Sequence, residues 1–165
     1  SQRIIKQKSA FPSVLTASQQ TKLKVVCKPA QTKVSLVAAA AKNKLELRQD
    51  RYKKISAQVK VITNQLTTSK VKTTELEAQS QQLAQLVATY DGSQQAYQQA
   101  LQDLKEVDCV VDPQGFNSLL LAARDARQKV VTDSQAIQAY IRTTLKPSLQ
   151  AIKTELSTIT NGVKQ

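Results

Sequence analysis

Two long runs of apolar residues at coiled-coil spacing constrain the fold of this chain more than any other feature. The first run advances in alternating steps of four and three, and only Arg48 interrupts its apolar set: Val34, Ala38, Ala41, Leu45, Arg48, Tyr52, Ile55, Val59, Ile62 and Leu66. The second run repeats at sevens: Leu76, Leu83, Tyr90, Tyr97 and Leu104. Each run is the seam of a coiled-coil helix. A short turn between them makes the two helices antiparallel.

The only two cysteines of the chain, Cys27 and Cys109, bracket these runs. An up-and-down hairpin returns the chain after position 108 to the level of position 27, so the pattern predicts a disulfide between them. A disulfide favours an oxidising compartment, and we therefore expect a secreted, cell-surface or periplasmic protein. A chain that begins at Ser1 rather than Met fits a mature product after signal removal or a recombinant product.

The ends of the helices have their own signals. We expect the first helix over about 30–68 and the second over about 75–108, where Thr74 and Glu77 form a capping box. The Asp91-Gly92 pair predicts a bend within the second helix, because glycine weakens a helix interior.

A third helix is predicted over about 113–161. Asp112 suits its N-cap and Pro113 its first turn, and Asn161-Gly162 is its stop signal. Its apolar stripe takes three successive steps of four from Ile137 to Leu149, a stutter that contains Pro147 and predicts a kink near 146–147. The chain is thus expected to be all-α, an elongated antiparallel three-helix coiled-coil bundle over 27–165 with one disulfide.

Residues 1–26 lack a sustained helical period and are predicted to form a basic N-terminal arm, with a short extended piece at 21–26. One interpretation is a mobile arm. The other is an arm that packs along the bundle or on a neighbouring subunit, because it is more apolar than a linker requires. The anchors of a packed arm would be Ile4, Ile5, Phe11, Val14 and Leu15.

The inventory of side chains argues against most chemistry. The chain has no histidine, which removes the commonest general base and the commonest metal ligand. Two distant cysteines do not make a zinc site, and three glycines do not make a phosphate loop. We therefore expect no enzymatic activity, no metal and no cofactor. No apolar run approaches the roughly 20 residues of a transmembrane helix.

Charge is the feature that points to a partner. Residues 1–72 hold sixteen Lys or Arg against two acidic residues, whereas 73–165 hold eight against ten. A solvated flank that complements acidic residues is one interpretation, and a surface that contacts a polyanion is the other. The candidate contact residues are Lys33, Lys44, Arg51, Lys53 and Lys60. Arg48 on the seam is interpreted as a residue that fixes register or extends to solvent.

Several short segments also carry a resemblance: Cys27-Lys28-Pro29-Ala30, Asp108-Cys109, the run Asp112-Pro113-Gln114-Gly115-Phe116, and the run Ala122-Ala123-Arg124-Asp125-Ala126-Arg127. Together they resemble exported coiled-coil proteins of patescibacterial bacteria, including saccharibacteria, over roughly residues 25–160. These proteins are functionally uncharacterised, so the resemblance implies export and the disulfide but no active site. A looser similarity, in size and basicity, is to the periplasmic holdase chaperone of outer-membrane proteins.

The sequence therefore predicts a non-enzymatic extracytoplasmic interaction or structural protein, whose basic arm and first helix contact an anionic surface, an anionic polymer or a neighbouring subunit. The alternatives are a basic holdase chaperone and a subunit of a self-assembling surface structure. A nucleic-acid partner is disfavoured, because Tyr52, Tyr90 and Tyr97 fall on core registers and leave few aromatic side chains for base stacking.

Overall fold

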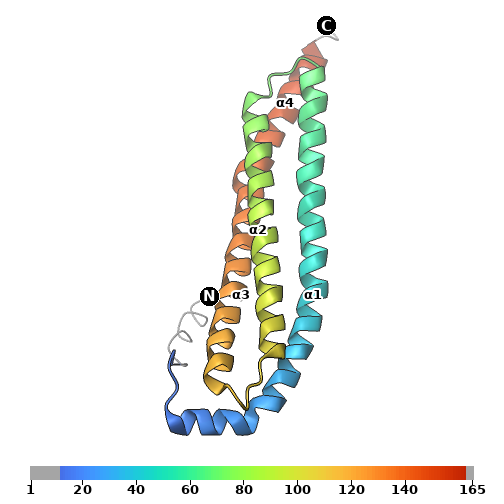
Figure 1. Ribbon diagram of the computed structural model, residues 1–165. Coiled ribbons are helices and arrows are strands. Elements are labelled where there is room, and N and C mark those ends of the chain that lie inside the picture. The colour runs from blue at the N-terminus through green and yellow to red at the C-terminus, as the bar shows by residue number, and fades with distance from the viewer. Residues whose placement is uncertain (1–11, 163–165) are drawn as a thin grey trace. The chain divides into compact units, whose positions relative to one another are not determined.

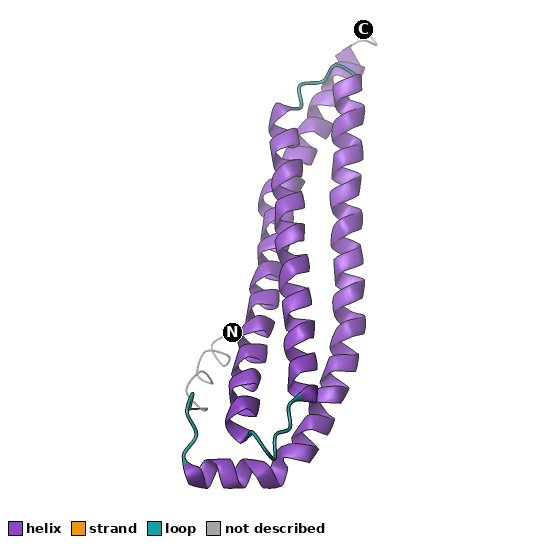
Figure 2. Cartoon of the chain, viewed as in Figure 1, coloured by secondary structure: helices purple, strands orange, loops and turns teal. Residues whose placement is uncertain are grey.

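The computed structural model describes residues 12–162, with side chains through residue 159. Helices and short connections account for all of this part of the chain, and no strand occurs in it (Figure 2). The elements are α1 (Ala17–Thr68), α2 (Thr74–Glu106), α3 (Pro113–Tyr140), the π-helical turn η2 (Ile141–Leu145) and α4 (Lys146–Gly162). The all-α class and the helical bundle predicted from the heptads are confirmed.

The chain forms two compact units. The first, which we call the disulfide unit, comprises Ser1–Leu45 and Ser93–Val130, and the second, the tyrosine unit, comprises Glu46–Gly92 and Val131–Gln165. Each unit brings together segments of the first, second and third helical stretches of the chain, and α1 and α2 are antiparallel in each (Figure 1). The units are described separately below.

The core of each unit consists largely of residues from the predicted seams. In the disulfide unit the buried apolar side chains include Leu45, Tyr97, Leu101, Leu104, Phe116, Ala123 and Val130. In the tyrosine unit they include Tyr52, Val59, Leu76, Leu83, Val87, Tyr90, Ile137 and Leu145. Side chains that repeat at three- and four-residue steps share one face of a helix, which explains why the heptads locate the core. Arg48 and Ile62 are the exposed positions of the first seam.

Helix α1 begins at Ala17, so the prediction of an arm over 1–26 and of a first helix from about 30 is wrong for residues 17–29. The segment 21–26 is helical rather than extended. Thr16 and Gln19 cap the helix reciprocally: the Thr16 amide donates to Gln19 Oε1 at 2.9 Å, and the Gln19 amide donates to Thr16 Oγ1 at 3.2 Å. This capping box is legible in the sequence and marks the start that the apolar pattern does not.

Pro29 lies inside α1 rather than at its start. Proline has no amide hydrogen and its ring displaces the carbonyl of the preceding turn, so it bends a helix that continues through it. The N-terminal part of α1 accordingly changes direction in its blue segment (Figure 1). Helix formation on both sides of Pro29 is compatible with the helical dihedrals that proline itself prefers.

The turn between α1 and α2 is held by backbone and side-chain caps. Lys70 adopts a positive φ of 60°, while the Val71 amide donates to the Leu66 carbonyl at 3.1 Å and the Lys70 amide donates to the Thr67 carbonyl at 3.0 Å. These two bonds are a Schellman motif. Helix α2 begins at Thr74 with Thr73 as its cap, and the Thr73 hydroxyl donates to the Glu77 carboxylate at 2.7 Å. The predicted capping residue was Thr74, so the cap lies one position earlier.

The remaining helix ends follow the sequence more closely. Asp112 caps α3 as predicted, because its Oδ1 accepts the Gly115 amide at 2.7 Å. Helix α2 is continuous through Asp91-Gly92. It ends at Glu106, two residues before the predicted end at 108. The third helical stretch is interrupted by η2 one turn before the kink expected at 146–147: the Lys146 amide donates to the Ile141 carbonyl, five residues back. A π-turn of this kind makes room for Pro147, whose ring displaces the carbonyl four residues before it.

Candidate functional site: the basic side chains of helix α1

The predicted contact residues all lie on α1 and all are exposed. Lys33 and Lys44 belong to the disulfide unit, whereas Arg51, Lys53 and Lys60 belong to the tyrosine unit. Because α1 is one of three helices in each unit, its outward side chains are left to solvent. The structure therefore provides two sets of accessible cations, one in each unit.

One of the five is engaged by a carboxylate. Lys53 Nζ lies 3.0 Å from Asp91 Oδ2, and the Asp91 side chain is only 20% exposed. This pair changes the interpretation of Lys53, because a cation that offsets a half-buried carboxylate is less available to an external partner. The pair also gives the carboxylate of Asp91 a partner of opposite charge. The neighbouring Gly92 makes no close contact, because a Cβ atom added there would face open space.

The other four candidates make no ion pair with any residue in the part of the chain that the structure describes: Lys33, Lys44, Arg51 and Lys60. The further ion pair on α1 joins Lys54 to Asp50 at 2.8 Å, and both side chains are well exposed. Exposed pairs of this type contribute little. The unpaired cations are therefore the residues that the structure leaves for an anionic partner.

Exposed apolar side chains accompany these cations, and the heptad pattern missed them. Leu36 in the disulfide unit is 68% exposed and lies one turn from Lys33. In the tyrosine unit Leu47 is 73% exposed one turn before Arg51, and Val61 is 53% exposed next to Lys60. Leu36 and Leu47 are eleven residues apart, a spacing of three helical turns that identifies an outer face by period. The exposed surface of α1 in each unit thus carries basic and apolar side chains, although Arg51 and Lys60 lie on opposite sides of the helix.

Arg48 lies beside a buried tyrosine. Tyr90 is fully buried, and its hydroxyl has no hydrogen-bond partner of good geometry. Burial raises the pKa of the Tyr90 hydroxyl, and the positive charge of the nearby Arg48 opposes that rise. Arg48 is itself exposed. The prediction that Arg48 extends from the seam to solvent fits this position, and its charge also acts on the buried Tyr90 hydroxyl.

Tyr52 completes a polar cluster in the tyrosine unit. Its ring meets that of Tyr90 edge to face, with centroids 5.1 Å apart. Its hydroxyl bonds the Ser134 hydroxyl at 2.8 Å, and the Gln138 amide donates to it at 3.2 Å. Tyr52 and Tyr90 are thus both part of the buried core, as their positions on the core registers predicted.

The Cys27–Cys109 disulfide is present, with Cα atoms 5.7 Å apart and both side chains buried. Two residues fix the chain around it. The side-chain Nε2 of Gln31 donates to the Val107 carbonyl at 2.6 Å and to that of Leu104 at 3.2 Å, which caps the end of α2. Asp108 Oδ1 accepts the amides of Val110 and Val111 at 3.0 and 3.2 Å, and these bonds lower the pKa of Asp108.

The segment before α1 is attached to the start of α3. Gln114 donates to the Ser13 carbonyl at 2.8 Å and accepts the Leu15 amide at 2.8 Å, and Asn117 donates to the Pro12 carbonyl at 2.9 Å. Of the predicted anchors, Leu15 is half-buried, whereas Val14 is 74% exposed. Ile4, Ile5 and Phe11 lie outside the described residues. Amide side chains on α3 thus hold residues 12–15.

Within residues 12–162, no three His, Cys, Asp or Glu side chains gather into a group that would hold a metal ion. None of the helices described is both long enough and apolar enough to cross a membrane. No protein-family model, curated protein or solved structure matches the chain. The resemblance to exported patescibacterial proteins therefore stays a prediction.

Proposed function

We propose that this protein is a non-enzymatic, extracytoplasmic interaction protein whose helix α1 binds an anionic polymer or surface through Lys33, Lys44, Arg51 and Lys60. The observation that carries the proposal is that these four cations are exposed and have no carboxylate partner in the described chain. Unpaired cations on one helix attract anions at long range and release counterions when they bind a polyanion.

Two further observations support the proposal. Exposed Leu36, Leu47 and Val61 accompany the cations, and apolar contacts add affinity that salt does not screen. The disulfide supports an extracytoplasmic location, because such bonds persist in oxidising compartments. The proposal includes no catalytic role, since the chain has no histidine to serve as a general base.

The test is binding of dextran sulfate, used as a generic polyanion, at several salt concentrations. We expect the logarithm of the association constant to fall linearly with the logarithm of salt concentration. The double variant Arg51→Gln/Lys60→Gln should weaken binding by about threefold to tenfold at low salt. Lys53→Gln/Lys54→Gln is the matched control, because it removes the same charge from the same helix and unit but from residues that are ion-paired.

The disulfide unit is tested separately with Lys33→Gln/Lys44→Gln, which should also weaken binding of dextran sulfate. Circular dichroism should show unchanged helicity in all variants, since every substituted side chain is exposed. Equal losses in the paired and unpaired variants would mean that net charge alone attracts the polymer. That outcome, or binding that does not depend on salt, would contradict binding through these four cations of α1.

A further inference from the structure

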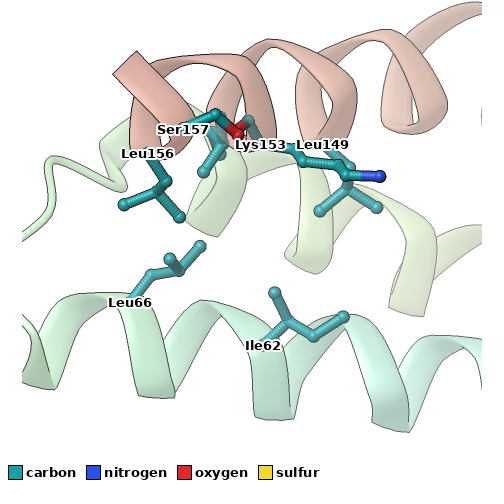
Figure 3. Close-up of a pocket in the computed structure, with 7 residues that line it drawn as sticks. Ile62, Leu66, Leu149, Lys153, Leu156 and Ser157 are labelled. Carbon is teal, nitrogen blue, oxygen red and sulfur yellow. The ribbon is translucent and has the colours of Figure 1, made fainter. Parts of the chain in front are cut away.

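The tyrosine unit contains an open apolar groove between the C-terminal part of α1 and helix α4. Its volume is about 330 Å³. Figure 3 shows Ile62 and Leu66 of α1 facing Leu149 and Leu156 of α4 across the open space. Ile152, Lys153 and Ser157 complete the lining. The groove lies apart from the cations proposed above to bind a polyanion, none of which lines it.

The groove exists because two seams that should close on each other do not. Ile62 remains 38% exposed, and Leu66, Leu149, Ile152 and Leu156 are only half-buried. These are the positions that the heptads assign to the core. Helix α4, which carries Leu149, Ile152 and Leu156, begins directly after the π-helical turn η2. The walls of the groove therefore remain apolar but only partly covered.

Lys153 is the one charged residue that lines the groove. Its side chain is exposed, lies beside Leu149 in Figure 3, and makes no ion pair with any residue that the structure describes. The Ser157 hydroxyl donates to the Lys153 carbonyl at 2.9 Å, so the nearby polar group is already engaged. An apolar groove with a single ammonium at its edge is complementary to a molecule with an apolar body and one negative charge.

The size of the groove selects among such molecules. A volume of about 330 Å³ lies near the lower end of ligand sites in proteins. A helix with its side chains is about 10–12 Å across and 5.4 Å long per turn, so even a single turn of a partner helix is larger than the groove. An unbranched alkyl chain is narrow enough to lie along the leucine and isoleucine side chains. We propose that the groove binds an anionic amphiphile of this kind, with the alkyl chain between α1 and α4 and the carboxylate at Lys153.

Isothermal titration of the full chain with decanoate, below the concentration at which decanoate forms micelles, tests this proposal. Decanoate should bind saturably and more tightly than decyltrimethylammonium, which has the same chain and the opposite charge. Lys153→Gln should weaken decanoate about threefold to tenfold, while Lys146→Gln, an exposed lysine of the same helix, should not. Ile62→Gln should weaken it about tenfold, while Val25→Gln, an exposed apolar residue of the same helix outside the groove, should not.

Three outcomes would overturn the assignment. Equal affinity for decanoate and decyltrimethylammonium would remove the role of Lys153, and equal losses in Ile62→Gln and Val25→Gln would remove the groove. A dimer by light scattering that Ile62→Gln dissociates and Val25→Gln does not would identify a second copy of the chain as the occupant. Melting curves of each variant test whether a loss of binding reflects unfolding. We expect them to be unchanged, because Ile62 and Lys153 are both at the surface.

Discussion

The two units of this chain solve the same packing problem by different means. In the disulfide unit the chain leaves its helices twice, before Ala17 and between Glu106 and Pro113. The unit fixes these irregular segments with a covalent bond and with amide side chains that bond backbone groups: Gln31, Gln114 and Asn117. Backbone groups outside helices need such partners when they are held against a core.

The tyrosine unit is fixed instead by contacts between side chains. Tyr52 bonds Ser134, and the Gln79 amide donates to the Ser148 hydroxyl at 2.8 Å. These pairs join α1 and α2 to the third helical stretch at defined levels, as polar residues on coiled-coil seams do. The comparison teaches that coiled-coil spacing alone does not complete either unit: one requires caps for its loops, and the other requires polar pairs and still leaves a groove.

The largest expected effect comes from breaking the covalent bond of the disulfide unit. The bond closes a loop of 82 residues in sequence separation, and the chain entropy lost by such a loop corresponds to about 4–5 kcal/mol. We expect Cys27→Ser/Cys109→Ser to lower the free energy of unfolding by an amount of that order in denaturant titrations. Wild-type protein in excess reductant is the control and should match the variant. An unchanged denaturation midpoint would show that the helices alone hold this unit.

Alkaline pH should weaken both units through their buried tyrosines. Burial raises the pKa of Tyr97 in the disulfide unit and of Tyr90 in the tyrosine unit. Above about pH 10 the unfolded chain loses these protons first, so stability present below that pH falls by about 1.4 kcal/mol per pH unit for each tyrosine that stays protonated in the fold. Tyr97→Phe and Tyr90→Phe should each remove the contribution of one tyrosine to this fall of the unfolding free energy with pH. A stability that is flat with pH up to the folded pKa values would contradict this assignment.

Tyr52→Phe tests the side-chain contacts of the tyrosine unit. It removes the hydroxyl that bonds Ser134 and Gln138 inside the fold, and we expect a loss of about 1–2 kcal/mol in the free energy of unfolding at neutral pH. Tyr90→Phe is the matched control, because it removes a buried hydroxyl that lacks a partner of good geometry and should change stability little. Equal costs for the two substitutions would mean that the Tyr52 cluster contributes no specific stability.

The amide caps of the disulfide unit should have a smaller and more local effect. Gln114→Ala removes the acceptor of the Leu15 amide and the donor to the Ser13 carbonyl. We expect exchange of the Leu15 amide hydrogen to accelerate, with a loss of about 1 kcal/mol at most in global stability. Gln128→Ala, at an exposed position of the same helix, should leave that exchange rate unchanged. If Leu15 exchanges equally fast in the wild type, the segment is not held in solution.

The smallest expected change is a gain at the turn of the tyrosine unit. Lys70 holds a positive φ of 60°, a conformation in which a side chain costs about 1 kcal/mol and glycine costs almost nothing. Lys70→Gly should therefore raise the free energy of unfolding by about 0.5–1 kcal/mol, measured by denaturant titration. Lys70→Ala removes the same charge and keeps the strain. A glycine variant no more stable than the alanine variant would exclude backbone strain at this turn.

Much of the architecture could be predicted from sequence, because it depends on period and on short-range caps. The seams located the core, the hairpin phase located the disulfide, and Asp112 with Pro113 located the start of α3. The start of α1 at Ala17 was not predicted, because residues 17–29 lack the sustained apolar period of the later seam, and only the capping box of Thr16 and Gln19 marks it. The π-turn was displaced by one turn from the predicted kink, because a stutter fixes the phase of a helix but not where the extra residue is absorbed.

The candidate site was less predictable for a physical reason. Whether a lysine is free depends on carboxylates from other helices, and only the structure pairs Lys53 with Asp91 while leaving Lys60 unpaired. The heptad pattern does not predict the groove, because it assigns Ile62 and Leu156 to a closed core. Leu36 and Leu47 are eleven residues apart. This spacing indicates a shared side of the helix, but it does not belong to the seven-residue repeat that identifies the seams.

The position of the disulfide also determines how the chain would carry a pulling force. Tension applied to the two ends of the polypeptide passes from Cys27 directly to Cys109, so the 81 residues between them bear none of it. At about 3.3 Å per extended residue, roughly 270 Å of chain stays out of reach of that force. A cut in the turn between α1 and α2 would likewise leave the two fragments joined as one covalent molecule. The bond thus makes most of α1 and all of α2 a closed loop attached to a shorter load-bearing chain.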